Sequence, residues 1–262
     1  MSKSNGNIPK KKIVIITVLV ILLLLFLFRN KIFLPMGEQV KFSVELPKEM
    51  ETSPLKVMYR SEICKASKPR SDGGSYKVPG YYYKEVIPSG SRDVNKYNIP
   101  LNGWGVCLWK LSNLIIETSY SNSLKYNANK IIGTGLIFVF DNNLPQLYHG
   151  PYEYSEGDEI FYGDVVMTKN YFPWYSYNIK QNSNVLWTYG GGVYSTYKVI
   201  NTKSISLAFK SNPGVIVHSE WPVNNKEREF TKYSYPDGSV IVSRDEKPDY
   251  ERLIHIKEKT NK

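Results

Sequence analysis

The sequence predicts an all-β fold, mainly an antiparallel sandwich or barrel with few short helices, preceded by a single transmembrane helix. From residue 55 onward, short segments rich in Val, Ile, Tyr, Phe and Trp alternate with Gly, Pro, Asn and Asp. Near the end, residues 230–235 alternate in polarity, Pro236-Asp237-Gly238 forms a turn signal, and residues 239–242 return as a second strand. Between Ile13 and Phe28, Thr17 is the one polar residue. These observations predict strands, a hairpin and an apolar helix.

Ten further segments fit short strands, and helix signals are few. Residues 113–130 fit either a strand or a helix, whereas Asp249 is expected to cap a short helix that contains Leu253. The expected strands cover residues 56–59, 81–87, 96–99, 106–111, 135–140, 164–169, 185–189, 193–200, 204–209 and 215–218.

The apolar N-terminal segment favours a membrane anchor over residues 13–34. The sixteen residues from Ile13 to Phe28 would span roughly 24 Å as a helix. Ile32 to Leu34 extend this length towards the ~30 Å of a hydrocarbon core. A cleaved signal peptide is the main alternative, but no alanine precedes Ala66, so an A-x-A-like cleavage site is missing. A buried core helix is the remaining alternative.

This anchor divides the chain into a cytoplasmic tail (1–12), the transmembrane segment (13–34), a polar stalk (35–54) and an exported β-rich domain (55–262). Four lysines precede the apolar segment, and only Arg29 and Lys31 follow it closely. The positive-inside rule therefore places the N-terminus in the cytoplasm and the remainder outside it.

The basic character of the chain does not predict nucleic-acid binding. The formal net charge is +10, but residues 1–34 alone contribute +6. The remaining residues carry 28 basic and 24 acidic side chains, so the folded part lacks a dominant positive field. The chain is long enough, and at 42% hydrophobic residues apolar enough, to bury a core.

The two cysteines predict one disulfide. Cys64 and Cys107 both lie in the part expected outside the cytoplasm, where an oxidising environment favours their pairing. Two buried free thiols are the alternative. A zinc site is not expected, because neither cysteine has a second Cys or His at ligand spacing.

No catalytic motif appears in the sequence. His218-Ser219-Glu220 cannot form a relay on a strand, because neighbouring side chains point to opposite faces. His255-Ile256-Lys257 resembles the opening of a phospholipase D motif, but Lys262 stands where that motif requires Asp. We therefore expect no enzymatic activity, no catalytic residue, no metal and no cofactor.

Two segments are candidates for binding a protein partner. The first is an acidic stretch that contains Glu153, Tyr154, Glu156, Asp158 and Glu159, which would suit a basic surface or would be a solvated loop. The second is an aromatic run that contains Tyr171, Trp174 and Tyr175, which fits either a core strand or an exposed contact patch.

Four short stretches, in this order, resemble a known family. They are Tyr59-Arg60-Ser61-x-x-Cys64, Pro100-Leu101-Asn102-Gly103-Trp104-Gly105-Val106-Cys107-Leu108-Trp109-Lys110-Leu111-Ser112-Asn113, Lys169-Asn170-Tyr171-Phe172-Pro173-Trp174 and Tyr235-Pro236-Asp237-Gly238-Ser239-Val240. Together they resemble bacterial immunity proteins that protect against type VI secretion phospholipase D effectors. In that family's pattern an acidic residue and a glycine stand where this chain has Asn102 and Trp104.

The resemblance implies a non-enzymatic protein of the cell envelope. It would be held at the inner membrane with its bulk in the periplasm, and it would bind and neutralise a secreted phospholipase. The motif residues would be structural: cysteines, turn glycines and core tryptophans. An envelope scaffold or glycan-binding protein is the alternative function, and a membrane-anchored hydrolase is a third.

Overall fold

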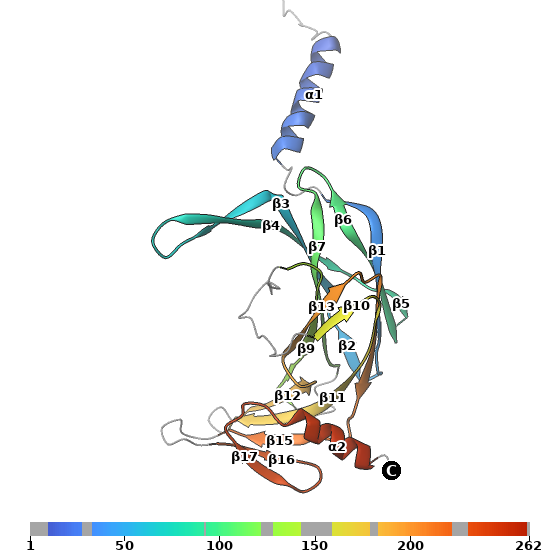
Figure 1. Ribbon diagram of the computed structural model, residues 1–262, viewed down its shortest axis with the longest axis vertical. Coiled ribbons are helices and arrows are strands. Elements are labelled where there is room, and N and C mark those ends of the chain that lie inside the picture. The colour runs from blue at the N-terminus through green and yellow to red at the C-terminus, as the bar shows by residue number, and fades with distance from the viewer. Residues whose placement is uncertain are drawn as a thin grey trace, which may run out of the picture. The chain divides into compact units, whose positions relative to one another are not determined.

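The computed structural model describes residues 10–27, 33–91, 93–121, 128–142, 159–178, 183–221 and 230–260. Most of these residues lie in strands, as the sequence predicts (Figure 1). The elements are α1 (Lys10–Leu27), β1 (Leu34–Glu45), β2 (Met50–Thr52), β3 (Leu55–Pro69), β4 (Ser75–Val86), β5 (Ser89–Ser91), β6 (Val94–Trp104), β7 (Trp109–Tyr120), β8 (Lys130–Ile132), β9 (Thr134–Val139), β10 (Glu159–Tyr162), β11 (Val165–Asn178), β12 (Ser183–Tyr189), β13 (Tyr194–Ile200), β14 (Ser204–Ser211), β15 (Val217–Glu220), β16 (Thr231–Ser234), β17 (Val240–Ser243) and α2 (Tyr250–Thr260).

The chain forms two compact units. Unit 1 comprises Met1–Glu38, Tyr59–Tyr82 and Pro100–Lys110, and unit 2 comprises Gln39–Met58, Tyr83–Ile99 and Leu111–Lys262. Strands β1, β3, β4, β6 and β7 each contribute residues to both units. The boundaries therefore fall inside continuous strands, where no Gly-, Pro- or Ser-rich linker marks them.

Helix α1 does not match the predicted transmembrane segment. No helix in the described part of the chain is long and apolar enough to cross a membrane. The helix begins with three lysines, and its apolar part from Ile13 to Leu27 covers about 22 Å, against ~30 Å of hydrocarbon. Leu34, the expected end of the anchor, already belongs to strand β1. A transmembrane helix over residues 13–34 is thus not supported.

The segment expected to form a stalk takes part in the sheet of unit 2. Residues Lys41–Glu45 of β1 pair in parallel with Ser204–Ala208 of β14. Val40, Phe42 and Val44 are buried, because alternate side chains of β1 face the core. Residues 40–45 are therefore part of the folded sheet and not of a polar stalk.

Strand β11 links two sets of partners in unit 2. Its first half, Val165–Tyr171, pairs in parallel with β14. Its second half pairs in an antiparallel manner with β12 and in parallel with β15, starting at Trp174. Pro173, which has no N–H to donate, lies where the pairing changes from β14 to β15. Antiparallel pairs such as β11 with β12 occur as predicted, and parallel pairs such as β1 with β14 join strands far apart in sequence in addition.

The C-terminal elements confirm the local predictions. Strands β16 and β17 form the expected antiparallel hairpin, and Gly238 of its turn has a φ of +81°. The Asp249 carboxylate accepts a hydrogen bond of 3.1 Å from the Arg252 N–H and so caps α2. Leu253 and Ile256 of α2 pack into a cluster with residues of β11, β12 and β16 and with Tyr235, which follows β16; the strand residues are Phe172, Trp174, Tyr189 and Tyr233.

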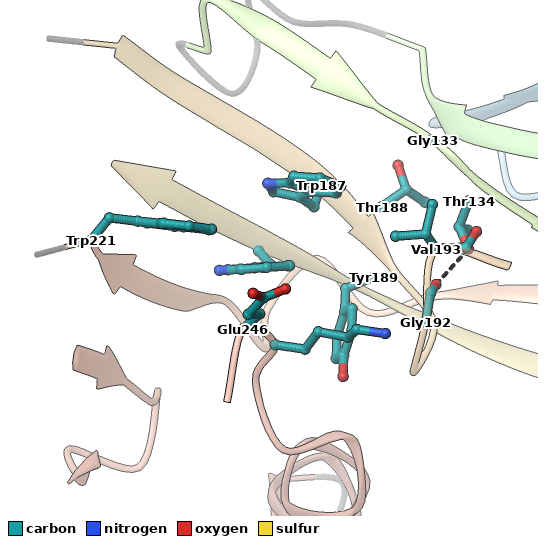
Figure 2. A pocket seen from close by; sticks show the side chains of 11 residues that line it. Gly133, Thr134, Trp187, Thr188, Tyr189, Gly192, Val193, Trp221 and Glu246 are labelled. Atoms are coloured by element: carbon teal, nitrogen blue, oxygen red, sulfur yellow. Dashed lines mark hydrogen bonds between the residues drawn. The ribbon is translucent and has the colours of Figure 1, made fainter. Parts of the chain in front are cut away.

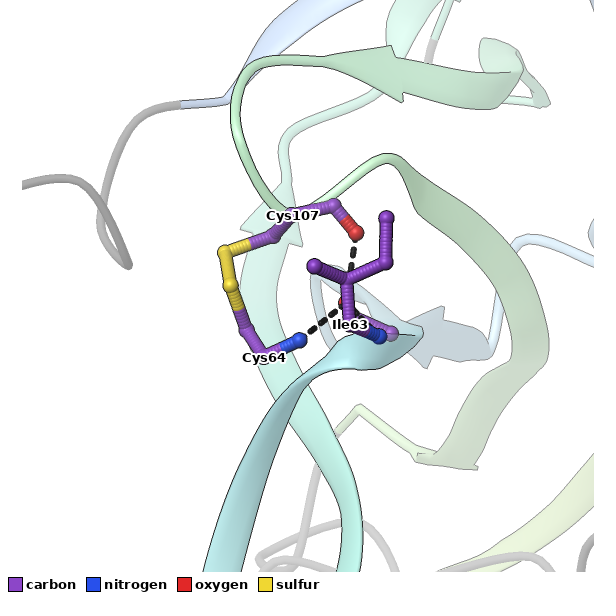
Figure 3. Close-up of a disulfide and its surroundings, with 4 residues drawn as sticks. Ile63, Cys64 and Cys107 are labelled. Atoms are coloured by element: carbon purple, nitrogen blue, oxygen red, sulfur yellow. Dashed lines mark hydrogen bonds between the residues drawn. A yellow bond between two sulfur atoms is a disulfide. The ribbon is translucent and has the colours of Figure 1, made fainter.

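Unit 1 contains the predicted disulfide between Cys64 and Cys107 (Figure 3). The buried Ser61 hydroxyl donates to the Cys107 carbonyl and accepts from the Ile63 and Cys64 N–H groups. The Phe33 ring stacks on Tyr82 at a centroid distance of 5.1 Å. A Cβ atom at Gly103 would lie 2.3 Å from the Phe33 ring, so only glycine fits at this position.

The packing of α2 predicts the effect of truncating its buried face. Leu253 is fully buried, so Leu253→Ala should lower the free energy of unfolding by about 2–5 kcal/mol. Chemical denaturation measures this change, and Lys259→Ala on the exposed face of the same helix is the matched control, expected within ~0.5 kcal/mol of the native protein. Equal effects of the two substitutions would show that α2 is not part of the core.

The disulfide predicts a sensitivity to reduction. It joins residues 43 positions apart, so its loss should destabilise the protein by roughly 4 kcal/mol in the chain-entropy model. Denaturation with and without a reductant measures the difference, and a Cys64→Ala/Cys107→Ala variant should no longer respond to the reductant. Labelling of both thiols in the native, non-reduced protein would contradict the bond.

Candidate functional site

An aromatic pocket in unit 2 is the best-formed candidate site. Its volume is about 120 Å³, and its wall is mostly apolar. Figure 2 shows Trp187, Tyr189, Trp221 and Glu246 around it. We call this site the aromatic pocket and define it by Trp174, Trp187, Tyr189, Trp221, Glu246 and Lys247.

The register of β11 and β12 creates the aromatic wall. Trp174 and Trp187 are direct cross-strand partners, and their rings stack at a centroid distance of 5.2 Å and an angle of 21°. Tyr189, two residues further along β12, meets Trp174 edge to face at 5.6 Å. Such cross-strand aromatic pairs stabilise a sheet, and here they also form one rigid side of the pocket.

The polar atoms of these rings are satisfied with one exception. The Trp174 Nε1–H donates to the Ser219 hydroxyl at 2.8 Å, and the Tyr189 hydroxyl donates to the Pro248 carbonyl at 2.6 Å. The Trp187 Nε1 is buried and has no hydrogen-bond partner among the described residues. Such a buried donor without a partner costs free energy in the folded chain.

The pocket has an open, partly charged rim. Trp221 follows strand β15 and is 37% exposed, in contrast to Trp174 at 4%. Glu246 and Lys247, just before α2, are exposed. The site therefore combines a fixed aromatic wall with a more accessible ring, one carboxylate and one ammonium group.

Strand β15 next to the pocket alternates buried and exposed side chains. Ser219 is buried and bonded to Trp174, while His218 and Glu220 are exposed on the opposite face of β15, as the sequence predicts. The His218 ring stacks on Tyr175 at 5.2 Å, and partial burial lowers the pKa of His218. Within the described ranges, no group of three or more His, Cys, Asp and Glu side chains could hold a metal ion.

A second, larger hollow of about 310 Å³ lies in unit 2 beside Glu117. The carboxylate of Glu117 accepts a bond of 2.7 Å from the Lys56 ammonium and another of 2.7 Å from the Tyr194 hydroxyl. The Glu117 carboxylate is already hydrogen-bonded within the protein. This hollow therefore offers a ligand fewer polar groups to bind than the aromatic pocket does.

The residues predicted to contact a partner differ in whether the structure describes them and in how deeply they are buried. Glu153, Tyr154, Glu156 and Asp158 lie outside the described residues, while Glu159 begins β10 and is exposed. Of the three aromatic residues that the sequence analysis proposed as contacts, only Trp174 lines the pocket. Tyr171 is fully buried, and burial raises the pKa of its hydroxyl well above the usual value. Tyr175 is half-buried against His218.

Sequence reasoning missed Trp187, Tyr189, Trp221 and Glu246 as site residues. Trp187 and Tyr189 lie in a strand that the sequence predicts, but nothing local shows which side chains oppose them. Trp221 and Glu246 come from separate segments that only the folded sheet brings to the same pocket.

Comparisons with known proteins give no further assignment. No family model matches the chain, and no curated protein or solved structure matches it significantly.

Trp174 and Trp221 differ in burial, so we expect their replacement by alanine to lower the stability of the protein by different amounts. Trp174→Ala removes a buried ring and a hydrogen bond, so it should cost about 3–5 kcal/mol of stability. Trp221→Ala should cost less, about 1 kcal/mol, because more than a third of this residue is exposed at the rim and no core contact depends on it in the cluster that holds Trp174. Denaturation of both variants measures the contrast. A larger loss for Trp221→Ala would mean that this ring belongs to the core.

Proposed function

We propose that this chain is a non-enzymatic binding protein of the bacterial cell envelope, an immunity protein that binds and neutralises a type VI secretion phospholipase effector. The observation that carries this proposal is the aromatic pocket, a preformed site with a rigid ring wall and a polar rim. Aromatic side chains of this kind dominate the binding energy of protein interfaces. The proposed mode of action is occlusion of the effector by binding.

The positions of the resemblance motifs support this proposal. The first two motifs meet in unit 1, where Tyr59 donates to the Pro100 carbonyl at 2.9 Å and Cys64 is bonded to Cys107. The third and fourth meet in unit 2, where Trp174 and Tyr235 share one core cluster. The motifs therefore correspond to two structural centres, one in each unit, which fits their expected structural role.

Two features support a location at the outer face of the inner membrane. The disulfide fits an oxidising compartment such as the periplasm. The described side chains of α1 from Ile13 to Leu24 are exposed, and all but Thr17 are apolar. A helix that is apolar on every side needs an apolar environment, and the membrane supplies one. We therefore include membrane attachment through α1 in the proposal.

The aromatic pocket suits a side chain of the effector. Its volume of about 120 Å³ is close to that of an engineered cavity, ~150 Å³, that admits benzene. Stacked indole rings beside the carboxylate of Glu246 would attract a guanidinium or ammonium group through cation–π and ionic contacts. A phospholipase D site that holds a phosphate is rich in such groups, and the acidic stretch at 153–159 would serve as a second contact.

A glycan-binding function is the second candidate. It is favoured by the stacked rings of Trp174 and Trp187 in the pocket wall, since the flat apolar face of a sugar packs on aromatic rings. Binding of cell-wall oligosaccharides, with no effect on phospholipases, would select this function.

The proposal predicts inhibition by the purified full chain. Hydrolysis of phospholipid vesicles by a candidate effector, recognised by two H-x-K-x4-D motifs, should fall as the chain is added in stoichiometric amount. Trp221→Ala should weaken the complex roughly 30-fold or more, mainly through faster dissociation, if this ring is a central contact. Neutralising Glu153, Glu156, Asp158 and Glu159 together should weaken it by a similar factor if the acidic stretch binds.

The matched control neutralises four exposed acids elsewhere, namely Glu38, Glu45, Glu51 and Glu62. It removes the same charge and should leave affinity within about a factor of three, because exposed charges outside a contact contribute little. Unchanged phospholipase activity at saturating chain would contradict the proposed function. Equal weakening by the control and by the acidic-stretch variant would reduce the acidic contact to a general charge effect.

A further inference from the structure

Unit 1 presents a cluster of apolar side chains to solvent around its disulfide. Trp104, Val106 and Leu108 are 57%, 58% and 51% exposed, and Ile63 beside Cys64 is 58% exposed. Between them, Cys107 is fully buried. We call the segment Trp104–Leu108 the disulfide turn. Its alternate residues point outward, so a connection between β6 and β7 carries large apolar groups where polar residues are usual.

The backbone holds these side chains outward. The disulfide and the Ser61 hydroxyl tie Cys107 to β3 (Figure 3), and the Leu108 N–H donates to the Gly105 carbonyl at 3.2 Å. Leu108 has a φ of +44°, a left-handed conformation that is unfavourable for a residue with a Cβ. A strained residue that presents an apolar side chain to water points to a function outside the core.

Almost all of the net charge of the protein belongs to the same unit. Unit 1 contains twelve Lys and Arg against three Asp and Glu, whereas unit 2 contains 22 and 21. Unit 1 thus accounts for +9 of the formal net charge of +10. Without residues 1–34 it still holds six basic and three acidic residues, among them Lys65 and Lys110 next to the disulfide and the turn. Such a charge favours a surface of anionic lipid headgroups.

The disulfide turn is also tethered close to the end of α1. Phe33 packs against Gly103, which directly precedes the turn. Leu27, the last residue of α1, is six residues before Phe33, and six residues reach at most about 20 Å. An apolar helix that enters a membrane therefore holds the turn within reach of the headgroup layer.

We propose that the disulfide turn is a second membrane contact, in which Trp104, Val106, Leu108 and Ile63 insert into the interfacial layer of an anionic bilayer while basic residues of unit 1 bind its headgroups. Tryptophan favours this layer because its ring is apolar and its N–H is polar. The inference rests on the proposed membrane attachment of α1. Two contacts on one unit would restrict how the protein is oriented on the membrane surface.

Indole quenching by brominated lipid tests this contact in the full chain. The protein is bound to vesicles of phosphatidylglycerol and phosphatidylcholine with brominated acyl chains, because bromine quenches tryptophan emission only at short range. We expect Trp104→Phe to remove most of the quenched emission. Trp221→Phe is the matched control, since it removes a partly exposed tryptophan of unit 2 and should leave the quenching in place.

Flotation of the same vesicles distinguishes membrane attachment through α1 from membrane contact by the disulfide turn. Failure of the native chain to float overturns both the attachment through α1 and the contact by the turn. A chain that floats, but whose quenching is the same with and without Trp104, retains the attachment and overturns the turn contact. Equal quenching in vesicles of phosphatidylcholine alone overturns the role of anionic headgroups. Burial of Trp104 only on addition of an effector would make the turn a protein interface and would overturn the proposal.

Discussion

Backbone pairing along β11 is the constraint on which most of unit 2 depends. One strand pairs with β14 in its first half and with β12 and β15 in its second, and the change of partner occurs at Pro173, which has no N–H to offer. The same strand therefore places Tyr171 in the interior of the sheet and Trp174 in both the C-terminal core cluster and the aromatic pocket. Because the pocket wall and the core share Trp174, binding and stability cannot be separated at that residue, whereas they can be separated at Trp221.

Much of the local structure could be predicted from the sequence, because its causes are local. Pro236-Asp237-Gly238 identifies a hairpin, Asp249 identifies the start of α2, and two cysteines in a chain with an apolar leader segment indicate a bond. The parallel pairing of β1 with β14 leaves no such signal, since Ser43 and its partner Ser206 are 163 residues apart. The aromatic pocket was missed for a similar reason, because β11 must pair with β12 and β15, strands on either side of it in the sheet, before Trp187 and Trp221 lie near Trp174. The apolar composition of the N-terminal segment predicts a helix, but it does not predict that this helix ends at Leu27.

The separation of charge between the units sets how each would recognise its partner. Unit 2 contains nearly equal numbers of basic and acidic residues, so it has little net charge with which to steer a partner over a distance. Recognition by its aromatic pocket would depend on short-range contacts, and such contacts influence dissociation more than association. Unit 1 differs from unit 2, because its net positive charge can attract an anionic surface over about a Debye length. Its exposed aromatic rings add contacts only after it has reached that surface.

The distance in sequence between β1 and β14 also affects how the protein is made. At ~5–20 residues per second, the partner of Ser43 is synthesised roughly 8–30 seconds after Ser43 itself. During this interval Val40, Phe42 and Val44 have no completed sheet to cover them, and an unpaired strand is prone to aggregate. The Cys64–Cys107 loop needs only 43 residues and so becomes available much earlier. In an oxidising environment unit 1 can thus be cross-linked while β1 of unit 2 still lacks its partner strand, so the two units differ in how early their long-range contacts can form.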